Sequence, residues 1–133
     1  MDQAVLVREQ IEAGIELVRR VNARMPVTAA FWLKETDVPR WYLFIASDAL
    51  ENADPRKGYR VVREAVEAMN DAGVELFQVK VVPSSDPFAR AARELVDGST
   101  RTSPYWLGPA PLGDRLVDGA CIYPPGVLDL VAQ

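Results

Sequence analysis

The chain has 133 residues, of which 49% are hydrophobic and 26% are charged, and this balance excludes a disordered or fibrous protein. The length matches one folding unit, so we expect a single domain over residues 1–133. The net charge of −4 provides no general attraction to nucleic acid or to an anionic membrane.

Two features of the composition limit the chemistry. The chain contains no histidine, which excludes Ser-His-Asp and Cys-His triads and the HExxH zinc motif. Its single cysteine, Cys121, excludes an internal disulfide and a multi-cysteine zinc site. We therefore expect no metal and no cofactor, and we give catalysis by Cys121 little weight.

The first residues, Met1 to Gln3, lack the basic and apolar regions of a signal peptide. Charged residues or prolines interrupt every apolar run well short of a membrane span. We therefore expect a cytoplasmic protein that makes no contact with membranes.

Helical periodicity predicts the first element over residues 3–24, because Pro26 disfavours helical geometry at the residue before it. The apolar stripe of this amphipathic helix consists of Val7, Ile11, Ile15, Val18 and Met25.

Residues 27–34 and 41–47 are rich in aromatic and β-branched side chains, which predicts two strands of an antiparallel hairpin. Neither segment alternates between apolar and polar positions, as a strand with one wet face does. The pattern predicts that this sheet is covered on both faces, or that one face is a self-association surface.

The dipeptides Asp54-Pro55 and Asp86-Pro87 each predict a helix N-cap followed by proline at the first helical position. The first of these helices is expected to end at Gly73 and the second at Gly98. The apolar stripes are Tyr59, Val62, Val66 and Met69 in the first, and Phe88, Ala91 and Leu95 in the second. A valine-rich strand is expected between the two helices, over residues 74–82.

The C-terminal third is irregular in composition. Three prolines and two glycines within residues 99–113 predict a long ordered loop or a flap. Segments 115–117 and 120–123 flank Asp118-Gly119, which indicates either a two-residue hairpin or one bulged strand. The state of the chain after Pro124 is left open.

These elements follow the order α-β-β-α-β-α-β and predict an α+β fold with a mixed, mainly antiparallel sheet. We expect the first two helices to pack on the sheet, the third helix to lie at an edge, and residues 99–113 to cross one end.

One set of polar residues suggests a metal-dependent nuclease. Residues 78–80, Gln-Val-Lys, resemble the Gln-x-Lys form of the acid-x-Lys pair in restriction-endonuclease-like nucleases, with Asp48 ending the preceding strand. The resemblance implies that Glu75, Glu51, or Glu12 or Glu16 of the first helix supplies further carboxylates. Two departures weaken it, because a whole helix separates the two strands and glutamine replaces the acid. We prefer to interpret Gln78 and Lys80 as solvent-facing residues of an edge strand.

Two further polar groups are weak candidates for binding anions. Arg56, Lys57, Arg60 and Arg63 share one face of the second helix, but Glu64 and Glu67 follow at ion-pair spacing. Residues 99–103 place Arg101 among hydroxyl side chains, a chemistry that suits an anion, without the glycines of a phosphate loop.

Aromatic residues are the more informative set. Trp32 and Trp41 are expected in the core, whereas Trp106 and its neighbour Tyr105 lie in the Pro/Gly-rich segment. Rings of this kind bury a large area at low entropic cost in protein interfaces. Trp106 is therefore either a binding anchor or part of a lid.

Residues 30–33, residues 41–47 and the closing pair Ile122-Tyr123 resemble a group of small uncharacterised bacterial proteins. The likeness spans most of the chain and is carried by strand patterns. It implies an intracellular bacterial protein and no particular activity.

The leading hypothesis from the sequence is a non-enzymatic binding or assembly domain that acts through an aromatic surface around Tyr105, Trp106 and Arg101. We expect a homo-oligomer, with another protein as a further partner and nucleic acid as an unlikely one. The alternative is the restriction-endonuclease-like nuclease that uses Asp48, Gln78 and Lys80.

Overall fold

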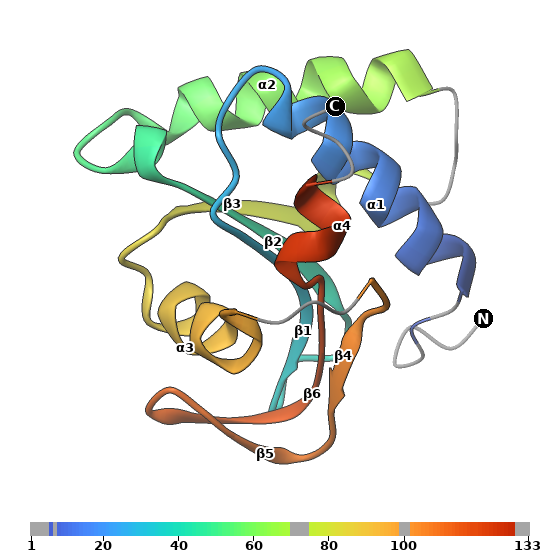
Figure 1. The fold of residues 1–133 in the computed structure, drawn as a ribbon, viewed down its shortest axis with the longest axis vertical. Helices are drawn as coiled ribbons and strands as arrows, with labels where there is room; N and C mark the ends of the chain where they lie inside the picture. The colour runs from blue at the N-terminus through green and yellow to red at the C-terminus, as the bar shows by residue number, and fades with distance from the viewer. Residues whose placement is uncertain (1–5, 7, 70–74, 99–101, 130–133) are drawn as a thin grey trace.

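A computed structural model describes residues 6, 8–69, 75–98 and 102–129 (Figure 1). It has the expected α+β fold, with the order α-β-β-α-β-α-β-β-β followed by a short C-terminal helix. The helices are α1 (Arg8–Asn22), α2 (Pro55–Met69), α3 (Pro87–Val96) and α4 (Pro125–Asp129), with 3-10 turns η1 (Asp48–Leu50) and η2 (Leu76–Gln78). The strands are β1 (Ala29–Glu35), β2 (Tyr42–Ser47), β3 (Val79–Pro83), β4 (Tyr105–Leu107), β5 (Ala110–Leu112) and β6 (Arg115–Ile122).

All six strands belong to one mixed sheet in the order β3-β2-β1-β6-β4, with β5 also paired to β6. The β1–β2 hairpin is antiparallel, as predicted, and Phe31 lies opposite Phe44 in its register. Strand β3 is parallel to β2 because α2 carries the chain back to the starting end of the sheet. The remaining pairs are antiparallel.

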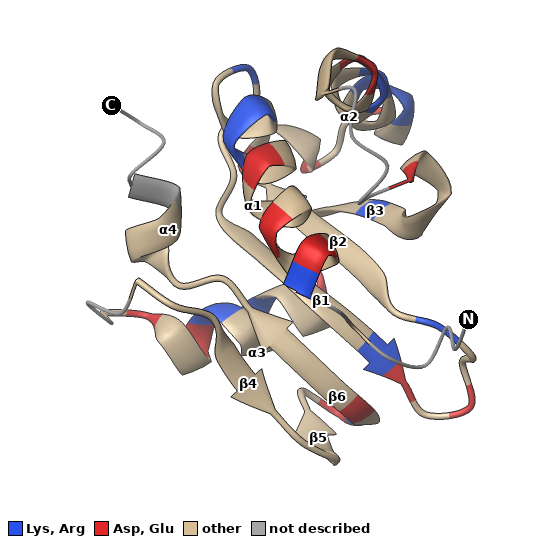
Figure 2. Cartoon of the chain, turned by 90° about the vertical axis from the view of Figure 1, so that its right-hand side faces the viewer, with Lys and Arg blue, Asp and Glu red and all other residues tan. Residues whose placement is uncertain are grey.

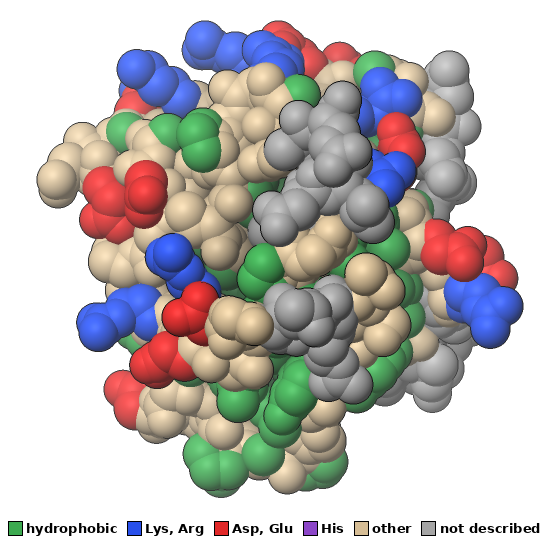
Figure 3. Space-filling view, in the orientation of Figure 1, with side chains coloured by type: hydrophobic (Ala, Val, Ile, Leu, Met, Phe, Trp, Pro, Cys, Tyr) green, Lys and Arg blue, Asp and Glu red, His purple; other side chains and the backbone are tan. Residues whose placement is uncertain are grey.

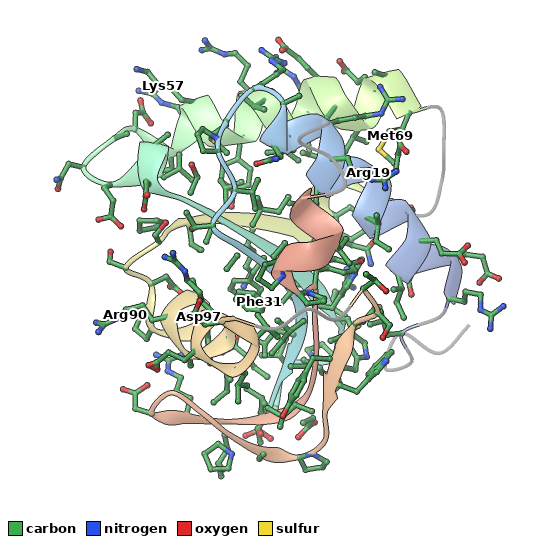
Figure 4. The ribbon with its side chains drawn as sticks, viewed as in Figure 1. Arg19, Phe31, Lys57, Met69, Arg90 and Asp97 are labelled. Atoms are coloured by element: carbon green, nitrogen blue, oxygen red, sulfur yellow. The ribbon has the colours of Figure 1, made fainter. Side chains whose placement is uncertain are left out.

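The sheet is covered on both faces over its central strands, which confirms the prediction made from the missing alternation. Trp32 of β1 points into a core shared with α1 and α2, whereas Phe31 and Leu33 point into a second core under α3. Figure 4 shows Phe31 between the sheet and α3. The expectation that the third helix lies at a sheet edge is wrong, because α3 covers the face opposite α1 and α2.

Both predicted helix caps are confirmed. The Asp54 carboxylate accepts the Arg56 backbone N–H at 3.0 Å. The Asp86 carboxylate accepts two backbone N–H groups, from Phe88 at 3.0 Å and Ala89 at 3.2 Å. The cap expected at Gly73 lies outside the described residues, and Gly98 has the positive φ of 74° that suits a helix stop.

The apolar stripes of α1 and α3 differ from the predicted ones. In α3 the buried positions after Phe88 are Ala89, Ala92 and Val96, while Leu95 is exposed. Small side chains line this face because they let the helix backbone approach the sheet closely. In α1 the buried residues are Ala13, Gly14, Leu17, Val18 and Val21. Val7 lies outside the described residues, and α1 ends at Asn22, two residues before the predicted end.

The strand predicted over residues 74–82 is shorter than expected. Residue 74 lies outside the described part, and η2 occupies 76–78 before β3 begins at Val79. A turn forms because the Gln78 backbone N–H donates to the Glu75 carbonyl at 2.9 Å, and the Gln78 side-chain oxygen accepts the Glu75 N–H at 3.2 Å.

The segment predicted as a long loop contains two strands. Strands β4 and β5 pair with successive parts of β6, so β6 has neighbours on both sides. Residues 115–122 form one strand, and Asp118 is the extra residue of a bulge opposite Lys34 and Glu35, so the bulged-strand alternative is confirmed. The two-residue turn lies instead at Gly113, whose φ is +67°.

No helix in the described part of the chain is long and apolar enough to span a membrane.

Candidate functional site

The nuclease candidates are not brought together by the sheet. Lys80 lies opposite Phe44 in the parallel β2–β3 pair, whereas Asp48 follows the last residue of β2. Four residue steps along the strand separate the two positions, or about 13 Å at 3.3 Å per residue. Gln78 lies a further two residues away, in η2.

Each candidate also has a structural partner. The Lys80 ammonium lies 4.4 Å from the centre of the Tyr42 ring, and the Glu51 carboxylate accepts the Ser85 backbone N–H at 2.8 Å. Glu16 of α1 forms an ion pair with Arg20 at 2.8 Å, on the side of the sheet opposite Lys80. Among the described residues, no group of three Asp, Glu or Cys side chains is arranged to hold a metal ion.

The basic face of α2 is partly neutralised by neighbouring acids. Arg56 pairs with Asp54, and the Arg56 guanidinium lowers the pKa of that carboxyl. The spacing in the sequence predicts that Glu64 pairs with Arg60. In the structure Glu64 binds Arg24, which lies beyond the end of α1, and this contact lowers the pKa of Glu64. Arg101 lies outside the described residues.

A hydrophobic surface lies on β4 and β6, on the side of the sheet that faces α1. We call it the Trp106 face and define it as Trp106, Leu116, Gly119 and Trp41 with the strand surface between them. Trp106 lies opposite Cys121, which points to the α1 side, so the indole of Trp106 is on that side too. Leu116 is next to Val117, which points to the α3 side, so Leu116 also faces α1.

The Trp106 face is not covered by a described helix. Figure 2 shows β4, β5 and β6 from this side, with α1 crossing the sheet farther along. Trp106 is 54% exposed and Leu116 is 64% exposed, although both are in strands. Hydrophobic side chains gather over β4 and β5 in Figure 3. This part of the sheet therefore presents two large apolar side chains to solvent.

Trp41 and Gly119 lie in the middle of the Trp106 face. A β-carbon at position 119 would lie 2.9 Å from Cη2 of Trp41, so only glycine lets the indole lie this close to the β6 backbone. Trp41 is half-buried, which leaves part of its ring at the surface. The bulge residue Asp118 directly precedes Gly119, against which the Trp41 ring packs.

Charges at the rim of the Trp106 face are paired within the chain. The Lys34 ammonium contacts the Asp118 carboxylate at 2.8 Å. Arg115, which lies 3.5 Å from Glu35, is on the other side of the sheet, over the Phe88 ring. The hydrogen bond from Lys34, with a second from Thr36, lowers the pKa of Asp118. The Lys34–Asp118 pair therefore adds no net charge to the rim.

The residues beside the face, under α1, are held by buried hydrogen bonds. The Trp32 indole N–H donates to the Tyr123 hydroxyl at 2.9 Å, and that hydroxyl donates to the Ile11 carbonyl of α1 at 2.6 Å. Burial raises the pKa of the Cys121 thiol to about 12, so the thiol stays neutral and is a poor nucleophile.

Sequence reasoning identified Trp106 and missed Leu116 and Gly119. Tyr105, its other aromatic candidate, is half-buried on the α3 side of the sheet and does not belong to the Trp106 face. The sequence does not distinguish Leu116, because the run Arg115-Leu116-Val117 does not show which side of the strand is covered. For Gly119 the sequence predicts only a turn or a bulge together with Asp118.

No protein-family model, no curated protein and no solved structure matches the chain. The resemblance to small bacterial proteins therefore stays a prediction.

Proposed function

We propose that the chain is a non-enzymatic assembly domain that binds protein through the Trp106 face, and that the partner is a second copy of the chain. The exposure of Trp106 on a sheet strand is the observation that carries this proposal. Tryptophan is among the residues most enriched in the energetically dominant centre of interfaces.

The geometry of the face supports contact with another protein. Trp106 and Leu116 lie on the same side of adjacent strands, with the Trp41 ring and Gly119 between their ends. Large exposed apolar side chains grouped on one part of a sheet commonly mark an interface. Small molecules bind in concave pockets, so exposed apolar side chains on a sheet suit another protein surface better.

Charge supports a second copy as the partner. A two-fold contact places the same patch against itself, so any net charge on the patch repels its counterpart. The whole chain carries a net charge of −4, but the Lys34–Asp118 ion pair at the rim of the Trp106 face adds no net charge there. Two copies can therefore meet there without the repulsion that most of their surfaces would produce.

Sedimentation equilibrium at micromolar concentration tests the proposal. The wild-type chain is expected to give a dimer, and Trp106→Ala is expected to weaken the dimer by about tenfold or more, as interface anchors do. Leu95→Ala is the matched control, because Leu95 is an exposed apolar residue on α3, away from the face.

A monomer mass for the wild-type chain at these concentrations contradicts self-association. If Trp106→Ala and Leu95→Ala weaken the dimer equally, the Trp106 face is not the interface. Circular dichroism of each variant checks that the fold is kept.

A further inference from the structure

The far edge of the sheet from β4 is formed by β3, which pairs only with β2 among the described residues. Its outward backbone N–H and C=O groups therefore have no strand beside them. We propose that this edge binds an extended acidic peptide segment of another protein, which adds to the sheet as a further strand. This inference is independent of the assembly proposed for the Trp106 face.

The backbone of β3 is suited to strand addition over a short length. Alternate residues within 79–82 direct their backbone N–H and C=O groups away from β2, and Pro83 ends this edge because proline has no N–H to donate. In strand addition the backbone hydrogen bonds supply affinity, and side chains beside the edge select the sequence. The side chains beside β3 should therefore identify the peptide.

Those side chains are cationic and aromatic. Lys80, in the middle of the exposed edge, lies over the Tyr42 ring at 4.4 Å and near the Phe44 ring at 5.6 Å. The Arg40 guanidinium lies 5.5 Å from the centre of the Phe77 ring. Two cation–π pairs from segments 40–42 and 77–80 thus lie at one end of the β2–β3 pair.

Neither cation is neutralised by a carboxylate. Within the described residues, no Asp or Glu oxygen lies within 4.0 Å of Lys80 or Arg40, whereas Lys34 and Arg115 at the other end of the sheet are ion-paired. Along the chain, the carboxylates nearest to Lys80 are Glu75 and Asp86, which lie beyond the two ends of β3. The rings orient the two cations and leave their charge available to an anionic partner.

Phe77 adds an apolar contact for such a peptide. It is 59% exposed, although one side of its ring lies against Arg40. An extended segment with acidic residues at alternate positions would place carboxylates beside Lys80 and Arg40 on one face. An apolar residue at its end would reach Phe77.

Charge and backbone chemistry argue against the other occupants of this edge. Antiparallel pairing of β3 with β3 of a second copy brings the two Lys80 ammonium groups close together, and like charges across strands are destabilising. A single-stranded oligonucleotide lacks the alternating backbone N–H and C=O groups that pair with a strand edge. A peptide needs only two or three carboxylates and gains backbone hydrogen bonds.

Fluorescence anisotropy with a labelled (Val-Glu)4 peptide, blocked at both termini, tests the proposal. The full-length chain is expected to bind it, and to bind the (Val-Lys)4 peptide and the (dT)8 oligonucleotide at least tenfold more weakly. Lys80→Glu is expected to weaken (Val-Glu)4 binding tenfold or more and to reverse the preference between the two peptides. Lys57→Glu is the matched control, because Lys57 projects from α2 on the other side of the sheet (Figure 4) and should change binding less than twofold.

Hydrogen exchange locates the bound peptide. The amides within residues 79–82 that point away from β2 are expected to gain protection when (Val-Glu)4 is present, and Trp106→Ala is expected to leave both affinity and protection unchanged. The proposal is overturned by absence of (Val-Glu)4 binding, by equal effects of Lys80→Glu and Lys57→Glu, by tighter binding of (dT)8, or by protection confined to another strand. A chain that fails this test can still dimerise through Trp106, so the two proposals fail separately.

Discussion

The hydrogen bonds of Tyr123 are expected to stabilise the fold measurably. The substitution Tyr123→Phe removes one oxygen atom from a buried site and keeps the ring. It leaves the Trp32 indole N–H without an acceptor, and Trp32 is 0% exposed, so water does not replace the lost partner. The Ile11 carbonyl also loses a donor, but it lies within α1, where a helical N–H satisfies it.

The size of the effect follows from the orphaned indole. A buried donor left without a partner costs about 1–3 kcal/mol, so we expect the free energy of unfolding to fall by about 2 kcal/mol. With a urea dependence of roughly 2 kcal/mol per molar, this loss lowers the urea midpoint by about 1 M. Gly14 explains why the site does not adjust easily, because a β-carbon there would clash with the Tyr123 hydroxyl and the helix therefore lies directly against it.

Urea unfolding followed by circular dichroism measures the effect. Tyr59→Phe is the matched control, because Tyr59 is 38% exposed on α2, and we expect a change within about 0.5 kcal/mol. A double-mutant cycle with Trp32→Phe should show losses that are less than additive by about 1 kcal/mol, since the double variant has no orphaned N–H. A Tyr123→Phe variant as stable as Tyr59→Phe would refute the account of the buried network.

Three further predictions concern other residues. Asp54→Ala and Asp86→Ala should each lower the free energy of unfolding by about 1 kcal/mol through loss of a helix cap, and chemical denaturation that shows no loss in either variant would contradict the assignment. The pKa of Cys121 is raised from 9.0 to about 12 in the folded chain, so stability that is complete below pH 9 should fall between pH 9 and 12 by up to about 1.4 kcal/mol per unit. Cys121→Ala should reduce this slope, and an unchanged slope in pH-dependent unfolding would show that the thiol does not contribute. Purified protein with Mg²⁺ or Mn²⁺ should leave DNA and RNA intact, and cleavage that disappears in Lys80→Ala would support the nuclease instead.

The elements that could be predicted are those with local causes. Each helix cap depends on an Asp-Pro pair and the next three residues, and the β1–β2 hairpin depends on two adjacent apolar segments. The class of fold and the cover on both faces of the central strands follow from these local patterns.

The elements that could not be predicted depend on distant partners. Strands β4 and β5 lie within residues 99–113, which contain three prolines and two glycines, and they form because β6 offers them an unpaired edge. The buried face of α3 is selected by how closely Ala89 and Ala92 approach the sheet, which periodicity alone does not show.

The Trp106 face could be predicted only in part, because residues distant in the sequence bring its side chains together. The composition of residues 99–113 made Trp106 conspicuous, but its position on a strand depends on pairing with Cys121. Leu116 and Gly119 join the surface only through the bulge at Asp118. Asp48 and Lys80, which are close in the pattern of a nuclease, are separated by the register of the parallel pair.

Photo-cross-linking from position 106 tests the central claim most directly. Trp106 is replaced by p-benzoylphenylalanine, isotopically light and heavy chains are mixed, and cross-linked peptides are identified by mass spectrometry. We predict cross-links between light and heavy chains that join position 106 to residues 104–107 or 116–119 of the second copy. We expect few such cross-links when p-benzoylphenylalanine replaces Leu95 instead. Cross-links confined to single chains, or equally frequent between chains from Leu95, would contradict assembly through the Trp106 face.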